Sequence, residues 1–276
     1  MNFNTLAKIA VQAALDAGAL IEKHLGTTLE VRHKGTGQNL ASQVVTDIDI
    51  ACEKLILSHL LPSCHRYDLA LLSEERPDDG SRFEKEYFWC IDPLDGTLPF
   101  IQNRPGFSVS IALVAQDGSP VIGVVYDPVK RNLYQAIKGE GVLKNDKPWV
   151  PLKKNNYLTY VTDKTLEETP SRAGIESSLE GITKEMNLEK IVEKSGGGSV
   201  MNAIYVLENA PACLIKLPKK EDGGGSIWDF AATACIFNEL QHSATNYDGD
   251  PLALNKRENT FMNDQGIFFS SIENSK

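Results

Sequence analysis

The chain has 276 residues and a formal net charge of −9, with 42% hydrophobic and 24% charged residues. This composition is typical of a globular protein with a substantial core, and the length suits one large domain or two packed ones. The negative charge argues against a nucleic-acid duplex or an anionic membrane as a partner. Bound metal ions could still bring an anionic substrate to an acidic site.

The five cysteines form no Cys-x-x-Cys pair and no disulfide framework. Cys90 and Cys235 lie in apolar segments, so we expect both in the core with reduced thiols, and we expect a cytoplasmic location. The chain starts Met-Asn-Phe-Asn, without the basic stretch and apolar core of a secretory leader. No apolar run is long enough to span a bilayer, so no membrane contact is expected.

Two helices are predicted near the start of the chain. Apolar residues recur at helical spacing over residues 4–24, which predicts an amphipathic helix. A second helix is expected over residues 50–61, with Asp47 or Asp49 as a cap and Pro62 closing it. Residues 34–43 are polar and contain glycine, which predicts a loop between the two helices.

A series of strands follows, separated by turns rich in Asp, Asn, Gly and Pro. The expected strands cover residues 69–73, 87–91, 107–115, 121–126, 133–137 and 141–144. The second half mixes strands at 157–162 and 213–217 with helices at 170–179, 200–207 and 230–241. We therefore predict a layered α/β (α+β) fold of two parts, with an antiparallel sheet in residues 1–150 and a smaller α/β part in residues 151–276.

The most informative segment is Asp92-Pro-Leu-Asp95-Gly96-Thr97, which follows the apolar residues 88–91. We predict that the strand ends there and delivers the two aspartates into a Pro/Gly turn. Carboxylates are costly to desolvate unless a positive partner meets them, and Mg²⁺ takes oxygen ligands of this kind. An Asp-rich turn between two strands without any function is the alternative interpretation.

Four more acidic residues fall at the edges of predicted elements and strengthen the metal interpretation. Glu74 with Glu75 follows a strand, Asp229 begins a helix, and Asp49 opens another. Such positions suit a site, because rigid elements aim the side chains while loops leave room for a substrate.

Gly96 and Thr97 could contribute as well. Their backbone N–H groups could meet a phosphate at a helix N-terminus, and the Thr97 hydroxyl could orient a water.

Three motifs together resemble the inositol monophosphatase superfamily, over nearly the whole chain and in the same order. They are Ser-Glu-Glu at 73–75, Asp-Pro-Leu-Asp-Gly-Thr at 92–97 and Ile-Trp-Asp-Phe-Ala-Ala at 227–232. The superfamily consists of Mg²⁺-dependent, typically lithium-sensitive phosphomonoesterases. The resemblance implies an αβαβα sandwich, with the metal site between two subdomains.

The resemblance also implies a ligand set for two or three Mg²⁺ ions. Glu74 would bind the first metal and contact the attacking water, and Asp92 would bridge the metals. The carbonyl of Leu94 would complete the protein ligands of the first metal. Asp95 and Asp229 would bind the second metal. Ions bound in this way would lower the pKa of water and stabilise the transferring phosphoryl group, without a covalent phosphoenzyme.

The same resemblance implies that Thr97 and Asp49 form the pair that helps to deprotonate the water. Asp49 is preferred to Asp47 because Glu53 follows it by four residues, as in the family. The implied substrate contacts are Gly96, Thr97, Gly197, Gly198, Ser199 and Asp229.

The segments that flank the three motifs are similar to the bacterial 3'(2'),5'-bisphosphate nucleotidases. This similarity implies 3'-phosphoadenosine 5'-phosphate as the substrate. Leu98-Pro99 and the glycine-rich segment 223–226 depart from the pattern of that group. An inositol-1-monophosphatase therefore stays open, and a catalytically silent phosphate-ligand binding protein is the alternative of another class. We expect a small phosphorylated metabolite as the partner, and the family often forms a homodimer.

Overall fold

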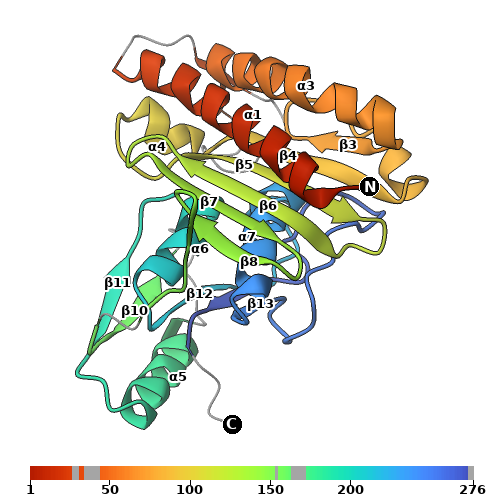
Figure 1. Cartoon of the computed structure of the whole chain (residues 1–276). Helices are drawn as coiled ribbons and strands as arrows, with labels where there is room; N and C mark the ends of the chain where they lie inside the picture. Colours follow the sequence, from red (N-terminus) through yellow and green to blue (C-terminus); the bar gives the residue numbers. More distant parts are fainter. Residues whose placement is uncertain (27–30, 34–43, 153–154, 163–171, 273–276) are drawn as a thin grey trace.

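The computed structural model describes residues 1–26, 31–33, 44–152, 155–162 and 172–272. Helices and sheets alternate in an αβαβα order, which confirms the expected layered fold (Figure 1). Helices α1 (Phe3–His24) and α3 (Asp47–Tyr67) cover one face of a seven-stranded sheet. Helices α6 (Ser199–Glu208) and α7 (Ile227–Glu239) fill the space between this sheet and a five-stranded sheet, and α5 (Arg172–Glu185) covers the far face. The loop predicted at 34–43 lies outside the described residues.

The seven-stranded sheet has the strand order β3-β4-β5-β6-β7-β8-β9. Its strands are β3 (Ala70–Ser73), β4 (Tyr87–Asp95), β5 (Ser108–Ala115), β6 (Pro120–Asp127), β7 (Asn132–Ile137), β8 (Gly141–Lys144) and β9 (Lys147–Pro148). Every neighbouring pair is antiparallel except β3 and β4, which run parallel. The predicted run of strands is confirmed, and it builds the sheet that carries two of the acidic residues.

The five-stranded sheet has the order β11-β10-β12-β14-β13. Its strands are β10 (Leu158–Val161), β11 (Ile191–Lys194), β12 (Ala212–Lys216), β13 (Ser243–Thr245) and β14 (Ile267–Ser270). Sequence analysis predicted β10 and β12, but not β11, β13 or β14. The strands β11 and β13 are short and partly exposed, so they lack the apolar alternation that marks a strand. Strands β1 (Val31–His33) and β2 (Val44–Thr46) form a separate antiparallel pair.

Helix α3 is longer than predicted, since Pro62 lies inside it and does not close it. Pro62 is exposed, whereas Leu60, Ser63 and Cys64 are buried. The Ser63 hydroxyl accepts a hydrogen bond from the Trp89 indole N–H at 2.9 Å, which ties the turn after the proline to β4. A proline inside a helix costs about 3 kcal/mol, so we infer that burial on both sides of Pro62 offsets this cost.

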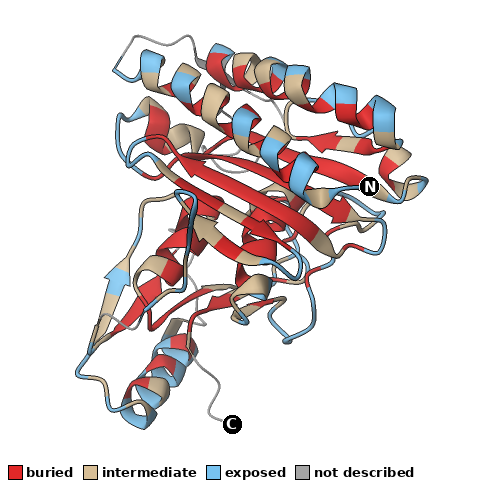
Figure 2. Cartoon of the chain, viewed as in Figure 1, coloured by how far each residue is buried: buried red, intermediate tan, exposed pale blue. Residues whose placement is uncertain are grey.

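The middle layer, which consists of α6 and α7, packs closely on the seven-stranded sheet. A Cβ added at Gly123 of β6 would lie 2.3 Å from the carbonyl oxygen of Ala232 on α7, so only glycine permits this approach. Figure 2 shows buried residues through the sheets and the middle helices, with exposed positions on the outer sides of α1 and α3. Along the sequence, the strands of the seven-stranded sheet come before residue 150 and those of the five-stranded sheet after it. One core cluster nevertheless spans the middle helices and both sheets, so the division into 1–150 and 151–276 stays a prediction.

None of the helices in the described ranges combines the length and hydropathy needed to cross a membrane.

Candidate metal centre

Strand β4 carries Asp92 and Asp95 within its length, and not in a turn beyond its end as predicted. Asp92 pairs with Ser110 and Asp95 with Ser108, so one extra residue lies on β4 between them and forms a bulge. Residues three apart on a regular strand point to opposite faces, and a single extra residue restores both to one face. The bulge therefore turns both carboxylates toward the middle layer.

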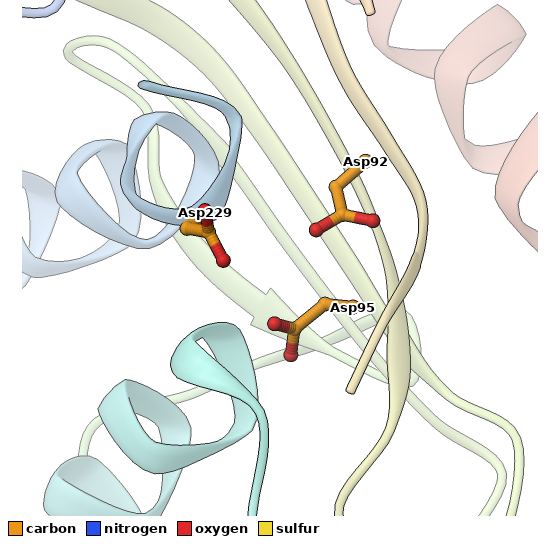
Figure 3. A group of neighbouring side chains, drawn as sticks. All are labelled: Asp92, Asp95 and Asp229. Carbon is orange, nitrogen blue, oxygen red and sulfur yellow. The ribbon is translucent and has the colours of Figure 1, made fainter. Parts of the chain in front are cut away.

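Asp229 reaches the same place from the first turn of α7. Ser226 caps this helix, and its backbone N–H donates to Oδ2 of Asp229 at 2.6 Å in a capping box. One carboxylate oxygen from each of Asp92, Asp95 and Asp229 lies within 4.8 Å of the other two. Figure 3 shows the three carboxylates converging from β4 and α7. The predicted aspartates are thus brought together from segments far apart in the sequence.

The electrostatics of these aspartates favour a cation. Burial raises the pKa of Asp92 well above its ordinary value, and the charge of Glu74 raises it further. Burial and then Asp229 raise the pKa of Asp95 in the same way, against the opposing effects of the Met201 backbone N–H and Lys216. Asp92 and Asp95 are only 1% and 4% exposed. Clustered buried carboxylates of this kind fit the hard oxygen ligation of Mg²⁺, which would remove their mutual repulsion.

Glu74 and Leu94 lie beside this cluster. Ser73 pairs with Ile91 across β3 and β4, so Glu74 follows next to Asp92, and its N–H donates to the carbonyl of Ile91 at 3.2 Å. The N–H of Leu94 donates to Oδ1 of Asp92 at 3.1 Å. Among the described residues, only the three aspartates form the tight group, so Glu74 borders it rather than completing it.

Thr97 and Asp49 are hydrogen-bonded, with the Thr97 hydroxyl 3.1 Å from Oδ1 of Asp49. The same hydroxyl lies 3.3 Å from the carbonyl oxygen of Leu94. Asp49 is 2% exposed, whereas Asp47 is exposed. Thr97 is the first residue of α4 (Thr97–Ile101), and Gly96 caps this helix with a φ of 81°. Thr97 is thus bonded to Asp49, and the catalytic role of the pair stays a prediction.

Glycines let the loop before α6 approach the aspartates. A Cβ added at Gly198 would lie 2.3 Å from Oδ2 of Asp95. The N–H of Gly198 donates to the carbonyl of Gly106 at 2.7 Å, and the N–H of Val200 donates to Oδ2 of Asp95 at 3.1 Å. Gly197 is held by the buried side chain of Asn202, which bonds to its N–H and its carbonyl at 3.2 Å each.

Lys216, at the end of β12, is the residue of this site that sequence reasoning missed. Its ammonium donates to the Ser199 hydroxyl and to the carbonyl of Gly224, both at 2.9 Å. It therefore joins the two glycine-rich loops at the edge of the acidic cluster. The only signal in the sequence is a lysine that ends an apolar strand shortly before a glycine-rich loop.

The glycine-rich segment 223–226 has a specific backbone shape. Gly225 has a φ of 116°, and a Cβ there would lie 2.6 Å from the Phe230 ring. Glycine at this position is thus required by close packing and by a conformation that other residues rarely adopt.

The fold and the acidic cluster define a layered α/β protein with a centre suited to hard divalent cations. The sequence model of the inositol monophosphatase family matches residues 2–272, and the chain belongs to this family. Members of the family are metal-dependent phosphatases, typically with Mg²⁺.

The chain is 31% identical over 257 residues to the inositol-1-monophosphatase of Synechocystis, covering 92% of this chain and 83% of the relative. With inositol monophosphatase 3 of Solanum lycopersicum it is 38% identical over 145 residues, and this match spans about half of each chain (51% and 50%).

Among solved structures, 2'AMP-bound SaIMPase-II of Staphylococcus aureus superposes with a TM-score of 0.71 at 22% identity, covering 96% of this chain and 88% of that one. The inositol monophosphate-bound form of the same protein has a TM-score of 0.68 at 23% identity, with the same coverage. At these identities the structural likeness shows the fold alone.

Proposed function

We propose that this protein is an Mg²⁺-dependent phosphomonoesterase, with 3'-phosphoadenosine 5'-phosphate hydrolysed to AMP as the reaction. The observation that carries the proposal is the convergence of Asp92, Asp95 and Asp229 beside the ammonium of Lys216. The carboxylates would hold two or three Mg²⁺ ions with Glu74 and the carbonyl of Leu94. When bound, these ions would lower the pKa of water and neutralise charge on the phosphoryl oxygens.

The residues of the chain would position the reactants and move the proton. Because the Thr97 hydroxyl donates to Asp49, its oxygen can accept a hydrogen bond from water and take the water's proton as its own proton passes to Asp49. Asp49 would hold the proton that Thr97 passes on. The backbone around Gly96, Thr97, Gly197, Gly198 and Ser199 would surround the substrate. The N–H groups of Gly197 and Gly198 already donate to Asn202 and Gly106, so they fix the shape of this loop, which needs no reorganisation as charge develops.

Lys216 favours a substrate with two phosphate groups. The scissile phosphate would be bound at the metals, and the positive charge of Lys216, which the bonds to Ser199 and Gly224 hold at the edge of the cluster, would attract a second phosphate. Inositol 1-phosphate has only one phosphate and offers no second anion. The lysine thus supports the bisphosphate nucleotide over a monophosphate.

An inositol-1-monophosphatase is the second candidate, and the Synechocystis relative favours it. The two bound forms of SaIMPase-II contain a nucleotide monophosphate and an inositol monophosphate, so they support neither substrate over the other. The proposal also includes lithium inhibition, a homodimer and a cytoplasmic location. The five buried free cysteines support the cytoplasmic location.

The experiment measures phosphate release with Mg²⁺ from 3'-phosphoadenosine 5'-phosphate and from inositol 1-phosphate, in the wild type and in Lys216→Met. We expect the nucleotide to be preferred, and Lys216→Met to lower its kcat/KM by roughly tenfold or more, with a smaller effect on inositol 1-phosphate. Lys220→Gln, at an exposed lysine four residues further along, is the matched control.

A preference for inositol 1-phosphate that Lys216→Met leaves unchanged would support the second candidate. Mg²⁺ binding without release of phosphate from either ester would support a silent binding protein.

A further inference from the structure

The two helices of the middle layer share an arrangement that the proposed chemistry does not use. Each begins at the acidic centre: Val200 in the first turn of α6 donates its N–H to Asp95, and α7 has Asp229 in its first turn. Each ends at a glutamate, Glu208 in α6 and Glu239 in α7. Both glutamates bind the hairpin formed by β7 and β8, residues 132–144.

Glu208 binds side chains of this hairpin. Its Oε1 accepts hydrogen bonds from the Tyr134 hydroxyl at 2.6 Å and from the Lys144 ammonium at 2.7 Å. Lys130, in the turn before β7, reaches Oε2 at 3.3 Å. Burial would raise the pKa of Glu208, but the bonds from Lys144 and Tyr134 outweigh it and lower the pKa to about 2. The carboxylate is therefore charged at neutral pH.

Glu239 binds the backbone of the same hairpin. Its two oxygens accept the N–H groups of Gly139 at 2.9 Å and Gly141 at 2.8 Å, one for each oxygen. Both glycines have a φ near 80°, so the turn between β7 and β8 directs these N–H groups toward the end of α7.

A glutamate is a poor last residue for an isolated helix, because the C-terminal end of the helix dipole is itself negative. Both helices nevertheless end in one, and in both the partners come from outside the helix. At 1.5 Å per residue, α6 extends about 15 Å and α7 about 20 Å from the hairpin to the acidic centre. In Figure 1 both helices lie between the seven-stranded and the five-stranded sheet.

We propose that the β7–β8 hairpin is a shared anchor that positions α6 and α7, and through them sets the Mg²⁺ affinity of the acidic centre. Glu208 and Glu239 are positioning residues in this arrangement. A shift of either helix along its axis moves the N–H that holds Asp95, or moves Asp229 itself. The inference rests on the proposed function where it concerns Mg²⁺, whereas the coupling along the helices does not depend on it.

The test compares Glu208→Gln, Glu239→Gln and the double variant with the wild type. Glu140→Gln is the matched control, since Glu140 is an exposed acid of the same turn that binds Asn4 of α1 instead. Hydrogen exchange is followed in the metal-free protein at residues 198–200 and 227–229. The Mg²⁺ dissociation constant is measured by titration calorimetry without any phosphate ester.

We expect the double variant to exchange roughly tenfold faster at both helix N-termini and to bind Mg²⁺ roughly tenfold more weakly, with each single variant affecting its own helix. Saturating Mg²⁺ should restore kcat, and Glu140→Gln should match the wild type. If the double variant folds poorly, Tyr134→Phe, which removes a single hydrogen bond to Glu208, should raise exchange at residues 198–200 alone and weaken Mg²⁺ binding.

Variants that lower the unfolding temperature, but keep wild-type exchange at residues 198–200 and 227–229 and wild-type Mg²⁺ affinity, would overturn the inference. If the wild type binds no Mg²⁺, the proposed function fails, and the exchange measurement still decides whether the hairpin positions the helices.

Discussion

The two faces of the seven-stranded sheet come from the same strands but differ in chemistry. Toward α1 and α3, Trp89, Ile91 and Leu94 of β4 join a core of apolar side chains. Toward the middle layer, the same strand presents Asp92 and Asp95, whose burial is unfavourable unless a cation compensates it. We infer that the outer face, toward α1 and α3, supplies stability alone, whereas the acidic positions of the inner face, toward the middle layer, supply the site within a second core cluster. Substitutions on the two faces should therefore have opposite consequences.

The largest expected effect comes from Asp92→Asn on the inner face. It removes the buried carboxylate that interacts with the charges of Glu74, Asp95 and Asp229, so Mg²⁺ binding should weaken strongly and turnover should fall by more than about a hundredfold. Circular dichroism should show an unchanged fold. Substantial Mg²⁺-dependent turnover in this variant would contradict the assignment of the metal centre.

A substitution on the outer face should do the reverse. Ile56 of α3 is fully buried between α3 and the sheet, so Ile56→Ala should lower the free energy of unfolding by about 2–5 kcal/mol. The Mg²⁺ dissociation constant of the folded protein should not change. Urea unfolding and calorimetry measure the two quantities, and a large loss of Mg²⁺ affinity would mean that the two faces are not independent.

A smaller effect is expected from Thr97→Ala, which removes a hydroxyl and leaves the carboxylates in place. Without the hydrogen bond to Asp49, kcat should fall by roughly tenfold to a hundredfold, while Mg²⁺ affinity changes little. Thr97→Ser keeps the hydroxyl and serves as the control. Equal losses of kcat and Mg²⁺ affinity would count against a role in orienting water.

Much of the fold could be predicted, because its elements have clear apolar patterns. The continuous apolar runs of β5 and β6 and the apolar face of α1 are visible in the sequence, and both reappear in the structure as buried residues. The predicted helix end at Pro62 was wrong because local propensity takes no account of the burial of Leu60 and Cys64 around it. The bulge between Asp92 and Asp95 could not be predicted, since pairing with β5 defines it.

The candidate site was predicted unevenly for a related reason. A motif of carboxylates points to a metal on its own, so Asp92, Asp95 and Asp229 could be selected from residue type and position. Lys216 becomes informative only when the fold places it against Ser199 and Gly224. Glu208 and Glu239 are likewise ordinary helix residues until the β7–β8 hairpin is seen beside them.

The central claim is that the inner face requires a cation, and its most direct test is unfolding of the wild type and Asp92→Asn against pH, with and without Mg²⁺. Because the pKa values of Asp92 and Asp95 are raised in the folded state, the metal-free fold binds more protons than the unfolded chain above pH 3.8. The aspartates therefore cost the metal-free wild type stability as the pH rises through the raised values.

We predict that metal-free Asp92→Asn is more stable than the wild type at neutral pH, and that Mg²⁺ raises the unfolding temperature of the wild type by far more than that of the variant. A metal-free variant less stable than the wild type, with the same Mg²⁺ shift in both proteins, would contradict the account.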